Sequence, residues 1–455
     1  MIETSRLFVR HALGASYEDM PEEARRAAKT FFLDTLGVGV AGAKAPYADE
    51  IFSVVEQWGA PRGAAAPVLG RAVSLPPPSA AYVNGFQIHC QEYDCVHEPA
   101  VVHPMATIFA ALTAEAARSG PVDGATFIAA MTAAVDIATG LGVAAKAPIK
   151  FFRPATAGVF GATLGCARLR GLSEAAALDA LGYALSQAAG TMQAHVEGKP
   201  ALPVQIAAAA RAALVAVDLA AAGVPGANDA VDGPFGYLPL FEGDYELAPV
   251  LDSLGEVWRI AQVSHKPFPT GRAAQGGIVA VQCLKTDEGV TAGALDSLTL
   301  TAPPLIHRLV GRPVTEDLSV NYARLCFPYL AAVTLRNGTV GLGDFSPEAL
   351  SDPETLGLAR RVRVIDDGNP DPAAFAPATL EARLVDGAVK RVAIDRLYGS
   401  PADPMSREAH LQKFRGCIAF GAGSADAAEA AIVRVDALED EPDVAALVGL
   451  FSAAS

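Results

Sequence analysis

The sequence predicts a mainly helical protein with a second, smaller α+β domain. Three observations predict this fold class. From about residue 21 to residue 223, apolar residues recur at helical spacing in a stretch rich in Ala and Leu. After about residue 264 short alternating runs indicate strands, and after Pro404 the pattern is helical again. We therefore expect a helical domain at residues 1–264, an α+β domain at 265–405 and C-terminal helices at 406–455.

The first domain contains five segments with the apolar period of a helix, and its many small residues predict close packing of these helices. A single stretch, Phe127–Ala145, is long enough to span a membrane. It contains Asp136 and lacks aromatic anchors, so we expect a buried helix and no membrane partner. The five predicted helices are Glu22–Val40, Thr107–Ala117, Phe127–Ala144, Ser173–Ala189 and Ile206–Ala222.

The second domain is predicted from alternating runs and turn residues. Leu380–Ile394 consists of two alternating runs around Asp386-Gly387, which is a strong hairpin pattern. Asn337-Gly338 is predicted to mark a second hairpin. Short helices are expected between the strands, because Ser346-Pro347 and Asp352-Pro353 each place an N-cap residue before a first-turn proline. The remaining predicted elements are strands at Leu298–Thr301 and Val362–Val364 and a helix that starts at Ser406.

Composition and charge exclude several classes of function. The chain has 455 residues, of which 51% are hydrophobic and 19% charged, as is typical of a globular protein. Its net charge of −15 argues against a nucleic-acid partner, since phosphate binding requires a basic face. Its six cysteines form no CxxC pair or regular framework, as expected of reduced thiols in a cytoplasmic protein. No signal peptide and no nucleotide-binding motif are expected.

The segment from Asn84 to Pro104 concentrates reactive side chains. It contains three of the eight histidines of the chain, two cysteines, and the acids Glu92 and Asp94. We expect Asn84-Gly85 to interrupt the regular secondary structure. Phe86–Cys95 would then form a helix that carries a histidine and a carboxylate on one face.

The prolines that follow predict a loop with two more histidines. Pro99 and Pro104 force a loop, and this loop carries His97 and His103. Protonatable groups that face carboxylates are a common way to place an acid and a base around a small molecule. The alternative is a capping loop whose histidines only satisfy backbone groups.

Further motifs occur in order along nearly the whole chain. They are Phe31–Gly37, Arg153–Gly158, Glu197–Pro200, His265–Pro269, and Tyr398–Ser406 with Lys413-Phe414. Together with residues 84–104, they resemble the motifs of the MmgE/PrpD family, in which an Asn-Gly pair leads through a histidine and an acidic cluster to a His-Pro. That family includes 2-methylcitrate dehydratase, cis-aconitate decarboxylase and iminodisuccinate epimerase.

The resemblance implies a fold, a partner and a chemistry. Both chain ends would form one large helical domain, with the α+β part inserted as a lid, and the protein would be a homodimer without cofactor or metal. The expected ligand is a small anionic polycarboxylate. Family members move a proton next to a carboxylate, which requires a base beside that carbon, cations on the carboxylates and an acid for the leaving group or returning proton.

The resemblance also implies catalytic candidates. His103, in the matching His-Pro, is the leading base or acid, because an imidazole pKa of about 6.5 suits either role. The alternative is an imidazole that only structures the loop. Lys199 occupies the position of the family's lysine and would contact a carboxylate or supply a proton. Glu92 and Asp94, near His97 or His103, would complete the set of acids and bases.

Substrate binding is expected from cations between the two domains. Lys266 and Arg272 lie in a proline-stiffened loop at the domain junction, where Arg272 would clamp a carboxylate. We expect Lys199 and Arg272 to surround one shared cavity, with Glu92 or His103 on its wall.

Several positions depart from the family pattern. The acidic cluster has Glu92, Cys95 and Val96 where relatives carry Asp, an acid and Thr, while Arg153 and Gln275 stand where histidines are usual. Neither Arg153 nor Gln275 can act as a base near neutral pH. The departures argue against simple inheritance of the dehydratase or decarboxylase activity. They predict a different di- or polycarboxylic acid, bound with the help of Arg153 and Gln275.

We therefore expect a cofactor-independent lyase that acts on a small di- or tricarboxylic acid, with dehydration or hydration as the leading reaction. Epimerisation and decarboxylation are alternatives, and a non-catalytic carboxylate-binding protein is an alternative of another class. Zinc binding is a rival because Cys90, Cys95, His97 and His103 are ligand types that zinc uses. Their spacing matches no common structural zinc pattern, so no metal is expected.

Overall fold

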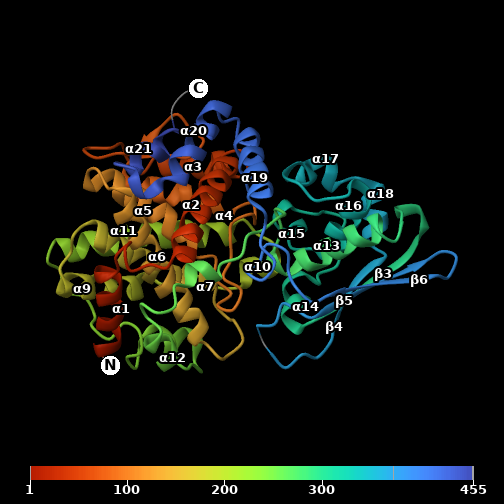
Figure 1. Cartoon of the computed structure of the whole chain (residues 1–455), viewed down its shortest axis with the longest axis horizontal. Coiled ribbons are helices and arrows are strands. Elements are labelled where there is room, and N and C mark those ends of the chain that lie inside the picture. The colour runs from red at the N-terminus through yellow and green to blue at the C-terminus, as the bar shows by residue number, and fades with distance from the viewer. Residues whose placement is uncertain (1, 372, 453–455) are drawn as a thin grey trace.

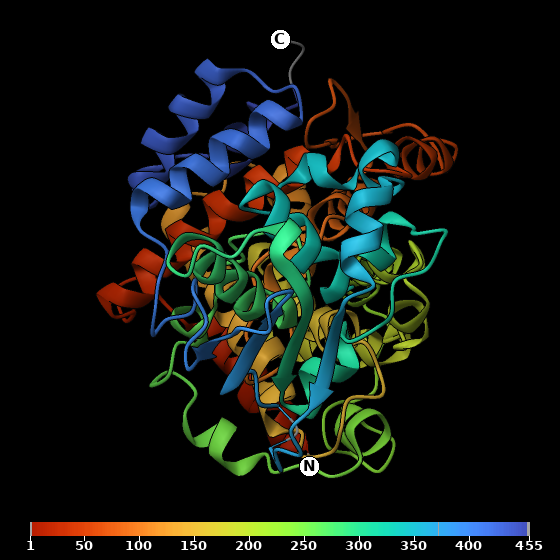
Figure 2. The same cartoon turned by 90° about the vertical axis from the view of Figure 1, so that its right-hand side faces the viewer.

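The computed structural model describes residues 2–371 and 373–452, which form two lobes along the long axis of the molecule (Figure 1). The larger lobe is the helical domain. The smaller lobe is the lid domain, which we define as residues 265–405, and Figure 2 looks onto the strands of its sheet. The predicted fold class, mainly α with a smaller α+β domain, is confirmed.

The first part of the helical domain is a bundle of closely crossing helices. Its elements are α1 (Ile2–Gly14), α2 (Glu22–Gly42), α3 (Ala48–Glu56), β1 (Ala66–Pro67), β2 (Ser74–Leu75), α4 (Pro77–His89), α5 (Pro104–Ser119), α6 (Gly124–Ala144), α7 (Arg153–Thr156), α8 (Gly158–Leu169), α9 (Glu174–Gln187), α10 (Gln193–Glu197), α11 (Ala201–Ala221), η1 (Leu238–Glu242), α12 (Ala248–Asp252) and η2 (Arg259–Gln262). Small residues let the helices approach: a Cβ on Gly161 of α8 would lie 2.2 Å from the Ala134 carbonyl oxygen of α6. The predicted close packing is therefore present.

The C-terminal helices return to this bundle, as the family resemblance implies. They are α19 (Arg407–Phe420), α20 (Ala425–Asp436), η5 (Leu438–Asp440) and α21 (Val444–Gly449). Both α19 and α20 contact α2, and α21 contacts α5 (Figure 1). One hydrophobic core joins residues from Phe8–Val263 with residues from Phe414–Phe451, whereas the lid domain has its own core between Phe268 and Leu397.

The lid domain is a four-stranded sheet with helices packed against it. Its elements are α13 (Arg272–Thr286), η3 (Ala292–Ala294), β3 (Leu295–Ala302), α14 (Pro304–Val310), α15 (Val320–Ala323), α16 (Phe327–Asn337), η4 (Leu342–Phe345), α17 (Pro347–Leu350), α18 (Pro353–Ala359), β4 (Val362–Asp366), β5 (Ala378–Leu384) and β6 (Val389–Ile394). The strand order is β4-β3-β5-β6, with β3 parallel to β4 and the other pairs antiparallel. The predicted hairpin around Asp386-Gly387 is confirmed, as are the helix starts at Ser346 and Asp352.

Two predictions based on Asn-Gly pairs are wrong. Asn337-Gly338 forms no hairpin, because it ends α16, with Gly338 in the left-handed conformation (φ 85°) typical of a helix C-terminus. Asn84-Gly85 does not break the chain either, since both residues lie inside α4. The predicted helix at Phe86–Cys95 accordingly ends early, at His89.

Among the residues that the structure describes, two helices, rather than the single predicted stretch, are long and apolar enough to span a membrane. They are α6, whose most apolar 18-residue window is 94% buried, and α11, whose window is 56% buried. The burial of α6 confirms the expected buried helix at Phe127–Ala144, and α11 packs against α4 and α8.

Candidate active site

A turn after α4 places the acidic cluster beside the junction of the two domains. Glu92 adopts a left-handed backbone (φ 51°) in this turn. Val96 then pairs with Ser264 in an antiparallel bridge, in which each backbone N–H donates to the other residue's carbonyl oxygen at 3.0 and 2.8 Å. Because Ser264 lies two residues before Lys266 in the chain, this bridge brings a buried cation to the cluster.

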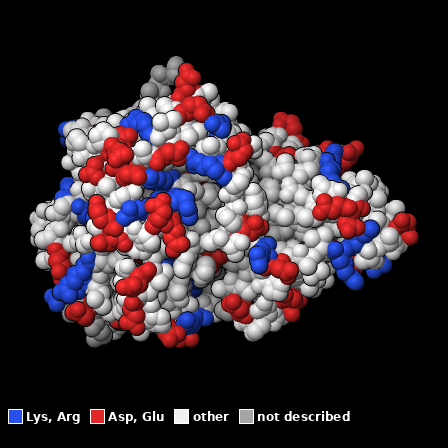
Figure 3. All heavy atoms as spheres, viewed as in Figure 1, with Lys and Arg blue, Asp and Glu red and all other residues white. Residues whose placement is uncertain are grey.

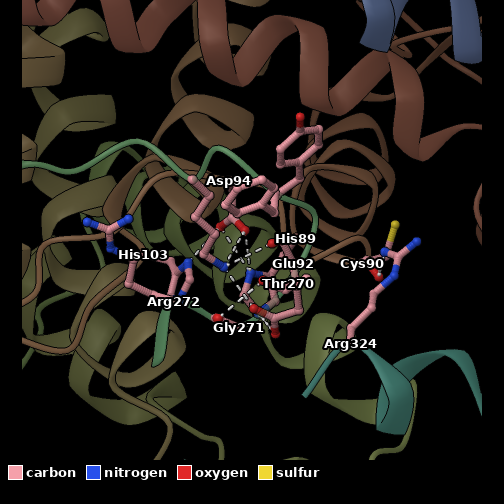
Figure 4. A network of polar contacts seen from close by, with 12 residues as sticks. His89, Cys90, Glu92, Asp94, His103, Thr270, Gly271, Arg272 and Arg324 are labelled. Carbon is pink, nitrogen blue, oxygen red and sulfur yellow. Dashed lines mark hydrogen bonds and ion pairs between the residues drawn. The ribbon is translucent and has the colours of Figure 1, made fainter. Parts of the chain in front are cut away.

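The Asp94 carboxylate accepts hydrogen bonds from two imidazoles (Figure 4). Nδ1 of His89 lies 3.0 Å from Asp94 Oδ2, and Nδ1 of His103 lies 3.1 Å from the same oxygen. Burial raises the pKa of Asp94, but the two imidazoles and Lys266 outweigh it and hold that pKa well below its usual range. The ionised carboxylate therefore keeps a proton on Nδ1 of each ring.

Glu92 forms the second half of the cluster with Lys266. The Lys266 ammonium, which is fully buried, lies 2.8 Å from Glu92 Oε2 and donates to the Glu92 carbonyl oxygen at 3.2 Å. Burial raises the pKa of Glu92, yet Lys266 and the neighbouring histidines lower it to about 2. Glu92 is therefore a carboxylate at neutral pH.

The pKa values of the two histidines on Asp94 are shifted in opposite directions. Burial disfavours the charge on His89, but the Asp94 and Glu92 carboxylates together raise its pKa. Burial and the Lys266 ammonium lower the pKa of His103, against the attraction of Asp94. His103 is therefore a neutral imidazole with its lone pair on Nε2, which is the state of a general base.

His103 and Glu92 line a cavity between the helical domain and the lid domain. Arg272 reaches the same cavity from the lid side, but its Nε donates to Glu98 Oε1 at 2.6 Å and its Nη1 donates to the Tyr398 carbonyl oxygen at 2.7 Å. Apolar side chains form most of the remaining wall. Among them are Val96, Val101, Ile149, Phe152 and Met192 of the helical domain and Leu309, Val310, Leu325 and Phe375 of the lid domain.

His195 is a cavity residue that sequence reasoning missed. Its Nδ1 lies 3.4 Å from Arg312 Nη2. Since a guanidinium only donates, Nδ1 is the acceptor and Nε2 carries the hydrogen. Burial, with the Arg312 charge, lowers the pKa of His195 to about 4, so the ring is a neutral donor. A signal was available, because His195 comes two residues before the motif Glu197–Pro200, which contains Lys199.

Lys199 and Arg272 do not surround one shared cavity, so that prediction is wrong. Lys199 lines a second, smaller cavity together with His89, Glu92 and Arg324. The two cavities adjoin, because Glu92 and Leu325 line both of them. Lys199 thus lies near the acidic cluster without reaching the His103 cavity.

His97 lies outside the cluster around Asp94. Its Nδ1 accepts from the Ala100 N–H at 3.2 Å, and its Nε2 lies 3.1 Å from Gln262 Oε1. Burial lowers its pKa to about 4. These contacts match the alternative interpretation of a histidine that structures the loop.

Arg153 and Gln275, the two expected substrate ligands, are used within the protein. Arg153 forms a bidentate pair with Glu242, with Nε 3.0 Å from Oε1 and Nη2 2.9 Å from Oε2, and it lines a different cavity. Gln275 donates to the Phe268 carbonyl oxygen and accepts from Arg272 Nη1 at 3.1 Å. The structure places neither side chain on the wall of the His103 cavity.

The rival zinc ligands are not brought together. In the described part of the chain, three donor atoms come close in two groups, Asp34–His265–His410 and His89–Asp94–His103. Neither group contains a cysteine or His97. Burial raises the pKa of the Cys90 thiol to about 12 and that of the Cys95 thiol well above its usual range, which disfavours the thiolate that zinc requires.

Comparison with known proteins identifies the class to which this fold and site belong. Residues 6–249 match the MmgE/PrpD N-terminal domain, and residues 268–439 match the MmgE/PrpD C-terminal domain. The chain therefore belongs to the MmgE/PrpD family. Curated relatives are the cis-aconitate decarboxylases of Mus musculus, 29% identical over 94% of this chain and 89% of the relative, and of Homo sapiens, 27% identical over 97% and 93%. A cis-aconitate decarboxylase of Aspergillus terreus is 24% identical over 88% of this chain and 86% of its own length.

Proposed function

We propose that the protein is a cofactor-independent lyase that acts on a small polycarboxylate in the cavity between its two domains. The observation that carries this proposal is the neutral His103 imidazole, which Asp94 orients on the wall of that cavity. Such a group suits proton transfer at a carbon next to a carboxylate. The decarboxylase names of the full-length relatives support the same class of substrate.

Decarboxylation is the first candidate reaction, because the relatives at 24–29% identity carry that name. In it, the bond between a carbon and its carboxylate breaks and carbon dioxide leaves. The electron pair stays on the carbon, which then takes a proton from the protonated form of His103. The neutral His195 and the guanidinium of Arg272 are the donors on the cavity wall that would stabilise the intermediate negative charge.

Dehydration is the second candidate, and the lowered pKa of His103 favours it. Neutral His103 would remove a proton from the carbon next to a carboxylate, and the electron pair would form a double bond as hydroxide leaves the neighbouring carbon. The hydroxide takes up the proton that His103 has removed and is released as water, which returns His103 to its neutral form. Both reactions use His103 for a proton transfer at carbon, but in opposite directions: it gives the proton in the decarboxylation and takes the proton in the dehydration.

A substrate panel tests the proposal. The purified protein is incubated with cis-aconitate, with hydroxylated tricarboxylates and with unsaturated and hydroxylated dicarboxylates, and mass spectrometry detects loss of carbon dioxide or water. We expect turnover of at least one polycarboxylate by the wild-type protein and its loss in His103→Asn. Binding of these anions without any mass change would favour the non-catalytic carboxylate-binding alternative.

A further inference from the structure

Most cations around the acidic cluster have a carboxylate partner, but Arg324 does not. Lys266 pairs with Glu92, Arg272 with Glu98, and the His89 imidazole with Asp94. Within residues 2–371 and 373–452, no carboxylate oxygen lies within ion-pair distance of the Arg324 guanidinium. A charge is thus left without its counter-charge at this site.

Arg324 is also incompletely hydrogen bonded, although it is buried. Arg324 is 2% exposed. Its Nη1 donates to the Cys90 carbonyl oxygen at 3.1 Å, but its buried Nε has no hydrogen-bond partner in the described structure. The guanidinium lies 4.7 Å from the centre of the Phe345 ring, which offsets part of the lost hydration. A buried cation with an unused donor is costly unless an anion completes it.

The surroundings of Arg324 suit a carboxylate. Figure 4 shows Arg324 beside Cys90, apart from the dashed contacts around Asp94. Arg324 lines the smaller cavity, to which Lys199 adds a second cation and Asn321 a neutral polar side chain. The one carboxylate on this wall, Glu92, is already neutralised by Lys266 at 2.8 Å.

We propose that Arg324, assisted by Lys199, binds the substrate carboxylate that lies farthest from the carbon on which His103 acts. This inference rests on the proposed function and specifies its substrate class. The two cavities share Glu92 and Leu325, so a ligand that passes between these side chains reaches both His103 and Arg324. Arg324 thereby selects tricarboxylates over dicarboxylates, which lack the group that it binds.

Calorimetric titration with two unreactive acids tests this selection. Propane-1,2,3-tricarboxylate carries the third, terminal carboxylate, and methylsuccinate is the dicarboxylate that lacks only that group. Because loss of a charge-assisted contact weakens binding about tenfold or more, Arg324→Met should raise the Kd of the tricarboxylate by at least that factor and leave the Kd of methylsuccinate nearly unchanged. Arg360→Met removes an exposed lid arginine as the matched control, and it should change neither Kd.

A merely structural role of Arg324 gives a different result. If Arg324 only ties the lid domain to the Cys90 carbonyl, Arg324→Met weakens both acids by the same factor or neither, and the proposal is overturned. Lys199→Met provides a second test if Arg324→Met fails to fold, because Lys199 is exposed. It should weaken the tricarboxylate selectively, and unchanged binding would refute the subsite.

The same titrations separate this inference from the proposed function. If Arg324→Met selectively loses tricarboxylate binding and the wild-type protein turns over no polycarboxylate, the proposed carboxylate subsite stands and the proposed lyase activity is refuted. If the protein turns over a polycarboxylate but its tricarboxylate binding does not depend on Arg324, the lyase activity stands and the subsite is refuted.

Discussion

At the scale of single residues, one carboxylate sets the charge of two histidines. His89 and His103 both donate from Nδ1 to Asp94 and lie with ring centres 4.9 Å apart. Glu92 adds a second negative charge beside His89, whereas Lys266 lowers the pKa of His103. The cluster therefore favours the charged form of His89 and the neutral form of His103, which is a pairing suited to acid–base chemistry.

The pH profile of kcat/KM follows from these two shifts. The pKa of His103 is lowered below its ordinary value of about 6.5, so a reaction that needs the neutral base should lose rate only as the pH falls below 6.5. The pKa of His89 is raised, so this residue should lose its positive charge only above pH 6.5. Its electrostatic attraction for an anionic substrate should be lost over the same pH range. Initial rates from pH 4 to pH 9 measure both limbs. An acid limb centred above 6.5 would contradict this assignment for His103 in a dehydration.

At the scale of elements, α4 shows why an Asn-Gly pair need not break a helix. The Asn84 side chain accepts from the Leu69 N–H and donates to the Pro67 carbonyl oxygen, both at 3.0 Å, so its polar groups are used by a neighbouring loop. At Gly85 a Cβ would lie 3.2 Å from the Ala207 Cα of α11, which makes glycine the residue that permits this crossing. Tertiary contacts, invisible to local pattern, thus override turn propensity.

The crossing of α2 and α4 gives a stability prediction. A Cβ on Gly42 would lie 2.0 Å from the Gln87 carbonyl oxygen of α4, so Gly42→Ala must push the helices apart. We expect a loss of about 1–3 kcal/mol in the free energy of unfolding. Gly416→Ala is the control: no atom lies within 4 Å of its Cβ, and Ala should stabilise α19 by roughly 0.5–1 kcal/mol. Urea denaturation of both variants measures the difference, and equal stabilities would show that the crossing tolerates a methyl group.

At the scale of the whole molecule, an ion pair joins the two ends of the chain. Lys413 of α19 lies 2.8 Å from the fully buried Asp34 carboxylate of α2, and it also donates to the Tyr93 carbonyl oxygen at 2.9 Å. Local sequence patterns predict both helices but not their contact. The return of the C-terminal helices was implied only by the family resemblance.

Removal of this pair should destabilise the helical domain. Lys413→Met leaves Asp34 buried without its cation, which typically costs roughly 3–5 kcal/mol. The double variant Asp34→Asn with Lys413→Met should recover part of that loss, because no buried charge remains. Urea denaturation compares the three proteins. A single variant as stable as the wild type would mean that the pair does not hold the C-terminal helices in place.

The candidate site could be predicted only where its residues lie close in the sequence. Glu92, Asp94 and His103 come from one segment rich in reactive side chains, and they lie together in the structure. Arg153 was expected to bind substrate, but its partner Glu242 lies in a distant segment and carries no local signal. Arg324 was missed for the same reason, since nothing in its neighbourhood marks it as a lone buried cation.

The most direct test of the central claim follows the proton that His103 transfers. Wild-type protein and His103→Asn are incubated in D2O with a polycarboxylate that the wild type converts, and mass spectrometry measures turnover and deuterium on carbon. If the reaction is a decarboxylation, we expect one deuterium on carbon in the product. If it is a dehydration, we expect hydrogen at the carbon next to a carboxylate to exchange for deuterium. The rate should fall by about 10²–10⁴-fold in His103→Asn. An undiminished rate with unchanged deuterium incorporation in His103→Asn would contradict the account.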